Sequence, residues 1–247
     1  MNLWYGHPLT SVLLVDTPLP EGEWTNLQPY GGRGWCRMEQ RASAMVKNAM
    51  CLISLSALTG EEKDWEEVMS KGKGARLPPM SPAAFAAMLE EGVASGEIKF
   101  TNSGDVGLVC KIYERAFLTE MGDATALDYY RLQWDDAAGA ELCEALRYAH
   151  AHGGLTKLTT LNLYGNKLGD GFVTSFVALL DEGGLAGVEA LLLYDNAISE
   201  QGMQELAAAI ARGGLPSCTQ IELRANPGSA APVKEAAEQR GGMMVNA

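Results

Sequence analysis

The sequence predicts an α/β protein in which short parallel strands alternate with helices over the C-terminal half of its 247 residues. Three observations support this fold class. The tripeptide Gly-Gly-Leu begins at Gly153, Gly183 and Gly213, a step of 30 residues each time. One apolar pattern follows each copy at the same offset. Within each unit the apolar spacing then changes from two residues to a helical period.

The chain divides into three predicted parts. Residues 1–78 form a small α/β region, residues 79–125 a helical linker or cap, and residues 126–247 the repeated segment. The first two parts are joined by a predicted linker over residues 71–82, because glycine and proline interrupt regular structure there. Its Lys-Gly-Lys-Gly start lacks the GKS or GKT ending of a phosphate-binding loop.

The N-terminal part predicts a βαβ unit. Residues 9–15 read as a buried-type strand, residues 35–46 as a helix, and residues 51–55 as a second strand. Such a unit pairs its two strands in parallel and packs the helix on them. The expected buried side of the helix consists of Met38, Ala42, Met45 and Val46.

Two amphipathic helices are predicted in the middle part. Ser81 as N-cap and Pro82 at the first helical position start a helix that runs to about Gly92. Asp105 is expected to cap a second helix. The apolar faces are Phe85, Met88 and Leu89 in the first helix, and Val109, Ile112, Tyr113 and Phe117 in the second.

The repeated pattern is LxxLxLxxNxL, and each position has a physical role. The LxL leucines alternate inward from a short strand, the asparagine satisfies backbone groups where the chain turns, and a helix follows that ends at Gly-Gly. The positions are Leu158, Leu161, Leu163, Asn166 and Leu168; Val188, Leu191, Leu193, Asn196 and Ile198; and Cys218, Ile221, Leu223 and Asn226.

The ends of the repeated segment are less regular. Upstream, a degenerate first unit places Leu127, Tyr130 and Leu132 in the core and puts Asp135 and Asp136 where asparagine is expected. Downstream, a polar helix over about residues 233–240 is followed by a tail, residues 241–247, that is expected to fray.

The run LTTLNLYGNKLGDGFVTSFVALL resembles the long, helix-containing leucine-rich repeats of ribonuclease inhibitor and of the NOD-like receptors. The resemblance covers about half the chain. It implies a stacked array with a curved parallel sheet, a protein-binding or scaffolding role, and repeats without catalytic residues or cofactors.

The residues between the inward leucines define one face of the sheet, which we call the outward face and which is concave in arrays of this kind. Its predicted partner-binding residues are Asn162, Tyr164, Leu192, Tyr194, Glu222 and Arg224, with Thr160, Ala190 and Gln220 alongside. Tyrosine and arginine are enriched in binding hot spots. The alternative is that the tyrosines only stack on one another and cover the strand edges, as in a purely structural spacer.

Charge and composition narrow the classes of partner that the protein can bind. The net charge of −12 disfavours nucleic acid and anionic membranes. No apolar run approaches the ~20 residues of a transmembrane helix and no signal peptide is evident, so the expected location is cytoplasmic. The five cysteines are widely spread without a CxxC, and the pair His150 and His152 has no companion ligands, so no metal site is predicted. The oligomeric state is left open.

A second resemblance lies near the N-terminus. Trp35-Cys36-x-x-Glu39, following an apolar strand and a loop, resembles the TIR-type domain of innate-immune proteins. It implies a signalling adaptor or an enzyme that cleaves NAD through Glu39, in a chain that is a fragment of a longer protein. The alternative is an ordinary helix turn in which Trp35 packs, Cys36 is buried, and Glu39 meets Arg33 or Arg37. The sequence therefore predicts a binding protein rather than an enzyme.

Overall fold

The computed structural model describes residues 2–7, 9–23, 27–73, 76–102 and 104–247. It divides into two compact units, Met1–Glu120 and Met121–Ala247. Over the described residues the chain is α/β, with parallel sheets in both units.

The N-terminal unit contains the predicted βαβ arrangement. Strand β1 (Val12–Leu14) pairs in parallel with β2 (Leu52–Ser54), and α2 (Gly34–Ser43) lies between them in sequence. The other elements are α1 (Asn2–Gly6), α3 (Trp65–Gly72), α4 (Pro82–Ser95), α5 (Asp105–Asp123) and short 3-10 helices at Tyr30–Gly32, Ala49–Cys51 and Leu55–Ala57. The expected inner side of the helix is confirmed for Met38 and Ala42. Met45 and Val46 are also buried, but they lie beyond the helix, which ends at Ser43 and not at the expected Val46.

The prediction of a buried strand over residues 9–15 is wrong in length and in burial. Only three residues form β1, and Leu9, Leu13 and Val15 are 87%, 53% and 67% exposed. Leu9 lies in a turn closed by the hydrogen bond from Thr10 N to His7 O. Among the described residues the sheet that contains β1 has two strands, and they leave part of β1 exposed.

The predicted linker over residues 71–82 is also corrected. Helix α3 extends to Gly72, after starting at Asp64, whose carboxylate accepts from Glu67 N at 2.9 Å. Lys73 and Arg76 are buried, and the Arg76 guanidinium donates to Ala44 O at 2.6 Å. Long cationic side chains bury their aliphatic stems when their polar ends find backbone acceptors. Residues 74 and 75 lie outside the described residues.

Helix α4 agrees with its sequence signals. Helix α5 forms as expected, but Asp105 is its first residue and not its N-cap, and the Asp105 carboxylate accepts from the Trp35 indole. Ser81 caps α4 by accepting from Ala84 N at 3.1 Å, and the helix continues three residues past Gly92. The Phe85 and Tyr113 rings stack with centroids 3.9 Å apart, which joins the two helices. Ile112 is only half-buried, whereas Val109, Tyr113 and Phe117 are fully buried.

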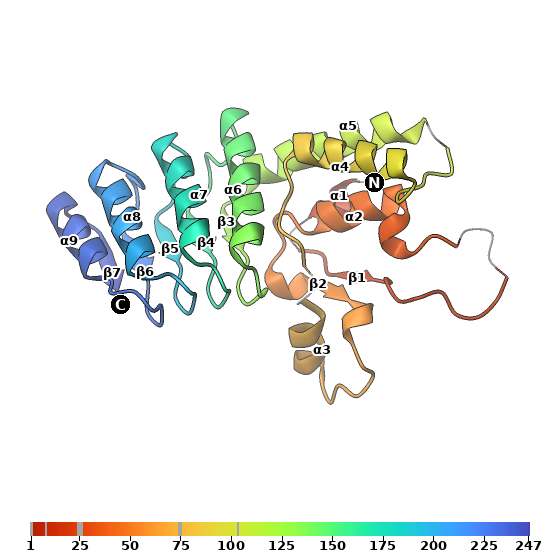
Figure 1. Cartoon of the computed structure of the whole chain (residues 1–247), viewed down its shortest axis with the longest axis horizontal. Helices are drawn as coiled ribbons and strands as arrows, with labels where there is room; N and C mark the ends of the chain where they lie inside the picture. Colours follow the sequence, from red (N-terminus) through yellow and green to blue (C-terminus); the bar gives the residue numbers. More distant parts are fainter. Residues whose placement is uncertain (1, 8, 24–26, 74–75, 103) are drawn as a thin grey trace. The chain divides into compact units, whose positions relative to one another are not determined.

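The C-terminal unit alternates strand and helix throughout. Its five parallel strands are hydrogen-bonded in sequence order, β3-β4-β5-β6-β7, and the helices stand side by side in the same order (Figure 1). The elements are β3 (Ala126–Asp128), α6 (Asp136–Ala151), β4 (Thr160–Asn162), α7 (Asp170–Asp181), β5 (Ala190–Leu192), α8 (Glu200–Ala211), β6 (Gln220–Glu222), α9 (Ala231–Arg240) and β7 (Met244–Asn246).

Helices α6, α7 and α8 end in the same way, at the three Gly-Gly-Leu tripeptides. Gly153, Gly183 and Gly213 have φ of 77°, 81° and 98°, the left-handed region that glycine enters without a steric penalty. After α6, Gly154 N donates to Ala149 O and Gly153 N donates to His150 O, which is the Schellman pattern. The predicted role of these glycines as helix caps is confirmed.

The predicted asparagine ladder is present. The Asn196 amide donates to Leu193 O of its own unit at 3.1 Å and to Leu163 O of the preceding unit at 2.9 Å, while its oxygen accepts from Leu168 N. Asn166 makes the corresponding bonds in the preceding repeat, to Tyr129 O and Leu163 O, and Asn226 makes them in the following repeat, to Leu193 O and Leu223 O. One asparagine amide per turn thus satisfies backbone groups of two adjacent repeats.

In the first repeat of the C-terminal unit, around Leu127, the inward and outward positions differ from the prediction. Leu127 pairs with Leu161 in register, so Tyr129 takes the place of the inward Leu163 and Leu132 that of Asn166. Tyr129 is fully buried, whereas Tyr130 lies on the outward face. Asp135 and Asp136 start the helix instead: Asp135 caps α6 and Asp136 accepts from Gly169 N and Gly171 N of the next unit.

The prediction that residues 241–247 fray is wrong. Residues Met244–Asn246 form β7, which pairs in parallel with β6, and Leu223 N donates to Asn246 O at 2.8 Å. Without β7, one edge of β6 would present unpaired backbone groups. The preceding polar helix is confirmed and begins at Ala231.

Candidate functional site

The outward face of the C-terminal sheet is built by strand register. Asn162, Leu192 and Glu222 are neighbours on β4, β5 and β6, and Thr160, Ala190 and Gln220 form the row before them. Two residues further along each strand come Tyr164, Tyr194 and Arg224. The sequence-predicted rows are therefore brought together as expected. Most of these side chains are half-buried; Glu222 is buried and Arg224 is exposed.

The tyrosines form one continuous stack. The Tyr164 and Tyr194 rings are 3.9 Å apart between centroids and 10° from parallel. The Arg224 guanidinium carbon lies 5.7 Å from the Tyr194 centroid, at one end of this pair. At the other end, Arg131 lies 4.8 Å from the Tyr164 centroid. Tyr164 and Tyr194 thus each have an aromatic ring on one side and a guanidinium group on the other. This arrangement is favoured by the ring quadrupole.

Two members of this stack, Tyr130 and Arg131, were missed from the sequence. Tyr130 is nearly parallel to Tyr164, at 6.3 Å between centroids. The signal that could have found them is the 34-residue step from Leu127 to Leu161, which replaces the 30-residue step of the later units.

Gly165 makes room for this end of the stack. Its φ is 70°, and a Cβ there would lie 2.7 Å from Arg131 Cγ. A larger residue at position 165 would therefore meet both backbone strain and the stem of the arginine.

The polar side chains of the middle row are paired with one another. Glu222 accepts from Gln220 Nε2 at 2.9 Å, from Asn246 Nδ2, and from Arg224 Nη2 at 3.1 Å. Burial by itself would raise the pKa of Glu222, but these hydrogen bonds and the Arg224 charge lower the pKa below its usual value. Asn162 Nδ2 donates to Asp128 Oδ1 at 2.8 Å. The face is thus a preorganised polar and aromatic surface.

Tyr194 of this face has a raised pKa and is neutral at physiological pH. Burial raises the pKa of Tyr194, and the adjacent Tyr164 raises it further, against the opposing charges of Arg224 and Arg131. A neutral phenol both donates and accepts hydrogen bonds. The face can therefore offer hydroxyl groups, guanidinium groups and ring edges to a partner.

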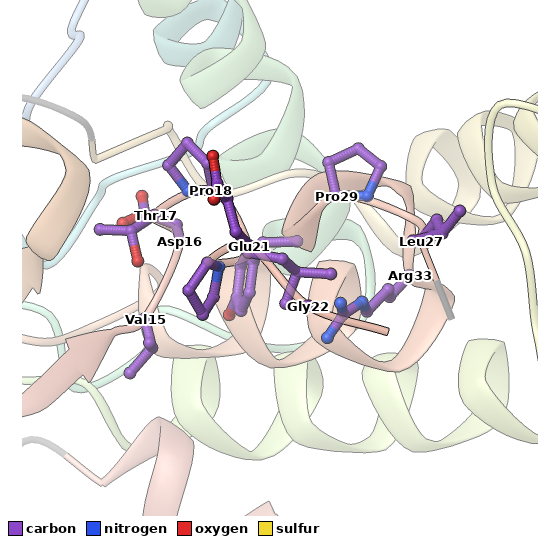
Figure 2. Close-up of a pocket in the computed structure, with 12 residues that line it drawn as sticks. Val15, Asp16, Thr17, Pro18, Glu21, Gly22, Leu27, Pro29 and Arg33 are labelled. Atoms are coloured by element: carbon purple, nitrogen blue, oxygen red, sulfur yellow. The ribbon is translucent and has the colours of Figure 1, made fainter. Parts of the chain in front are cut away.

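The N-terminal unit contains a separate cavity of about 480 Å³ at the carboxyl end of β1. In Figure 2 the segment from Val15 to Pro18 lies on one side of it, with Leu27 and Arg33 on the other. Asp16 has a structural role, because its carboxylate accepts hydrogen bonds from Ser54 Oγ at 2.6 Å and from Ser56 N at 2.9 Å. The lining residues are Val15, Asp16, Thr17, Pro18, Leu19, Pro20, Glu21, Gly22, Leu27, Pro29, Tyr30 and Arg33.

The Trp35–Glu39 motif lies on α2. The Trp35 indole donates to Asp105 Oδ2 at 3.0 Å, and Cys36 is half-buried. Glu39 is close to Tyr5 and Cys36: burial raises the pKa of both groups, and the Glu39 carboxylate raises it further. Within the described part of the chain, the residues that line the 480 Å³ cavity include neither Trp35 nor Glu39.

Arg33, one of the two arginines expected near Glu39, donates its Nε to Gln28 O at 2.8 Å. No group of three His, Cys, Asp or Glu side chains suited to a metal occurs among the described residues. His152 Nδ1 lies 2.8 Å from Tyr148 O, and His150 Nε2 lies 3.2 Å from Glu182 O. Among the helices described, none is long and apolar enough to cross a membrane.

No protein-family model matches this chain, and no curated protein matches it.

Proposed function

We propose that residues 126–230 form a leucine-rich-repeat array and that its outward face binds another protein. The fold part of this proposal is supported by five parallel strands in sequence order, each of the first four followed by a helix, and by an asparagine in three successive turns. Stacking units of this kind buries a continuous core and leaves one sheet face open.

The observation that carries the binding role is the stack of Tyr164 and Tyr194 between Arg131 and Arg224. Tyrosine and arginine supply a large share of the binding energy in known interfaces. Side chains that are already held in place lose less conformational entropy when a partner docks. A prestacked row of this composition is therefore suited to recognition.

The contrast with the helix side of the same unit supports this choice of face. There, arginines are engaged in ion pairs between adjacent helices: Arg147 with Glu182 at 2.9 Å and Arg212 with Asp181 at 2.8 Å. Exposed ion pairs of this kind contribute little to binding or stability. On the outward face, Arg131 and Arg224 lie against aromatic rings, although Arg224 also pairs with Glu222.

The test is capture from native extract by the intact immobilised chain, followed by identification of the retained protein and measurement of its affinity. Replacing both Tyr164 and Tyr194 by alanine should weaken the affinity by at least about tenfold, the loss expected for hot-spot residues. The melting temperature should change little, because both rings are on the surface side of the sheet.

Tyr148→Ala is the matched control. This tyrosine is also half-buried and stacked, on His152 at 4.0 Å between centroids, but it belongs to α6. Its replacement should leave capture unchanged. Equal affinity of the double variant and the unaltered chain would contradict the proposal, as would a loss of capture caused equally by Tyr148→Ala.

A second candidate function is NAD cleavage through Glu39. It is favoured by the closeness of Glu39 to Tyr30, whose side chain lines the 480 Å³ cavity and whose pKa is raised, chiefly by burial and further by Cys36 and Glu39. A carboxylate can stabilise the positive charge that develops on the ribose when the nicotinamide bond breaks. Release of nicotinamide from NAD by the intact chain, lost in Glu39→Gln, would support it; no release would eliminate it.

A further inference from the structure

Strand β1 has one open edge. It belongs to a two-stranded parallel sheet in which β2 is its only partner strand among the described residues. A sheet of two strands is marginally stable by itself, and parallel strands are normally covered on both faces. Among the described residues, the sheet that contains β1 has just two strands, and one of its faces is incompletely covered.

One face of this sheet is covered over both strands, whereas the other face is covered over β2 but exposed at β1. On one face, Leu14 and Leu52 pack together with Ala44. On the other face, Ile53 is 1% exposed and Gly72 of α3 packs against it, so closely that a Cβ on Gly72 would lie 2.4 Å from Ile53 Cγ2. Leu13 is the register partner of Ile53 and shares this face, yet it is 53% exposed.

The edge lacks two of the features that keep strands from pairing, charge and proline. Residues 9–15, LTSVLLV, contain neither, and Val15 is 67% exposed. Proteins protect free strand edges by keeping them short or by placing charged side chains, proline or a bulge on them, and β1, with three residues, has only the first of these. An apolar and β-prone edge that is protected by its shortness alone is suited to pairing with another strand.

We propose that this edge pairs with β1 of a second copy of the chain. The two strands run antiparallel about a twofold axis near Leu13 and join the two sheets in the order β2-β1-β1-β2. An uncharged strand is complementary to itself, because antiparallel pairing sets no like charges opposite each other. The contact is the same patch on both copies, so the assembly closes as a dimer.

Charge distribution favours this region for self-association. Residues 1–78 carry 8 basic and 9 acidic side chains, whereas residues 126–247 carry 8 and 15. Two copies that meet through β1 therefore bring together the most nearly neutral part of an acidic chain, where repulsion between like charges is smallest.

The test is the mass of the intact chain in solution, measured by light scattering after size exclusion over the micromolar concentration range. The mass should rise from 26.4 kDa towards twice that value with concentration. Leu13→Lys should keep the chain at its single mass, because it sets two ammonium groups near each other at the axis. Val15→Lys should act in the same direction and serves if Leu13→Lys does not fold.

Leu108→Lys is the matched control, since Leu108 is 51% exposed on α5 of the same unit. It should dimerise like the unaltered chain. A chain that stays at its single mass at every concentration overturns the proposal, and so does a Leu13→Lys variant that dimerises normally. The result is independent of partner capture through Tyr164 and Tyr194, because the two surfaces belong to different units.

Discussion

The two units bury different kinds of polar group. In the N-terminal unit the buried polar side chains include four cations, Arg41, Lys47, Lys73 and Arg76. In the C-terminal unit they are Asn166, Asn196 and Glu222. A strand that recurs in register needs one short amide per turn to satisfy its backbone. An irregular unit has carbonyl groups at unrelated positions, and long side chains are needed to reach them.

The buried cations connect segments that are distant in sequence. Arg41 Nη1 donates to Pro78 O at 2.8 Å, and Arg76 donates to Ala44 O. Lys47 donates to His7 O and to Thr10 Oγ1. These contacts tie residues 7–10 and residues 76–78 to α2 and to the chain that follows it. The C-terminal unit obtains the same cohesion from its repeated strand pairing and apolar core.

The largest expected effect is at Leu193, in the centre of the repeated core. Leu193→Ala should lower the free energy of unfolding by about 2–5 kcal/mol, because the side chain is completely buried and its loss leaves a cavity. Chemical denaturation measures this. Leu192→Ala, at the adjacent half-exposed position, should cost much less. A loss at Leu193 below about 1 kcal/mol would contradict the assigned inward phase.

Asn196→Ala tests the amide ladder. The change leaves Leu168 N without its partner in a buried site and removes one of the two asparagine donors from Leu163 O and from Leu193 O, so we expect a loss of about 1–3 kcal/mol. Asn162→Ala is the control, since Asn162 is half-buried on the outward face. Amide hydrogen exchange should also become faster at Leu168. Equal effects of the two variants would mean that the ladder contributes no more than a surface hydrogen bond.

The predictability of each unit follows from its periodicity. In the C-terminal unit, strand positions, helix ends, the ladder and the outward rows could be deduced, because each is repeated and errors in one copy are corrected by the others. The failures there were at the ends. Tyr129 and Leu132 break the pattern at the first unit, and β7 has no LxL pair to mark it.

In the N-terminal unit, α4 was predictable from its cap and periodicity, whereas the predictions for residues 9–15 and 71–82 failed in part. Residues 71–82 were expected to form a linker because of their glycines and prolines, yet Lys73 and Arg76 are buried. Leu13 and Val15 were expected inside because they are apolar. Both errors concern side chains whose burial depends on what lies beside them in space. The candidate site at Tyr164 and Tyr194 was predictable, but Arg131 was not, since its place depends on the open space over Gly165.

Lys47 gives the N-terminal unit a pH dependence at alkaline pH. Burial lowers the pKa of Lys47 to about 8; Cys51 and Glu120 oppose this shift and Arg76 adds to it. Unfolded, the group has a pKa near 10.5, so between these values the unfolded chain binds more protons and stability rises with pH. In Lys47→Met, this rise in the free energy of unfolding should be smaller than in the unaltered chain by roughly 1–3 kcal/mol. Denaturation of both proteins measures the difference.

The exposed Lys111 provides the control for this measurement. Lys111→Met should retain the rise in stability between pH 8 and 10.5, because this variant leaves Lys47 in place and changes only an exposed side chain. If Lys47→Met and Lys111→Met follow the same pH profile, Lys47 is not the group responsible.

The smallest effect is expected where β7 completes the outward face. Asn246→Ala removes one of the hydrogen bonds that lower the pKa of Glu222, so this pKa should rise towards its ordinary value. A carboxylate with a lowered pKa stabilises the fold above its unfolded pKa and loses that contribution as the pH falls, so the variant should be slightly less stable above that pKa and should lose less stability on acidification. An NMR titration of Glu222 measures the shift. Asn162→Ala, whose partner is Asp128, should leave the pKa of Glu222 unchanged. An unchanged pKa in Asn246→Ala would mean that the last strand pairs through its backbone alone and does not organise the outward face.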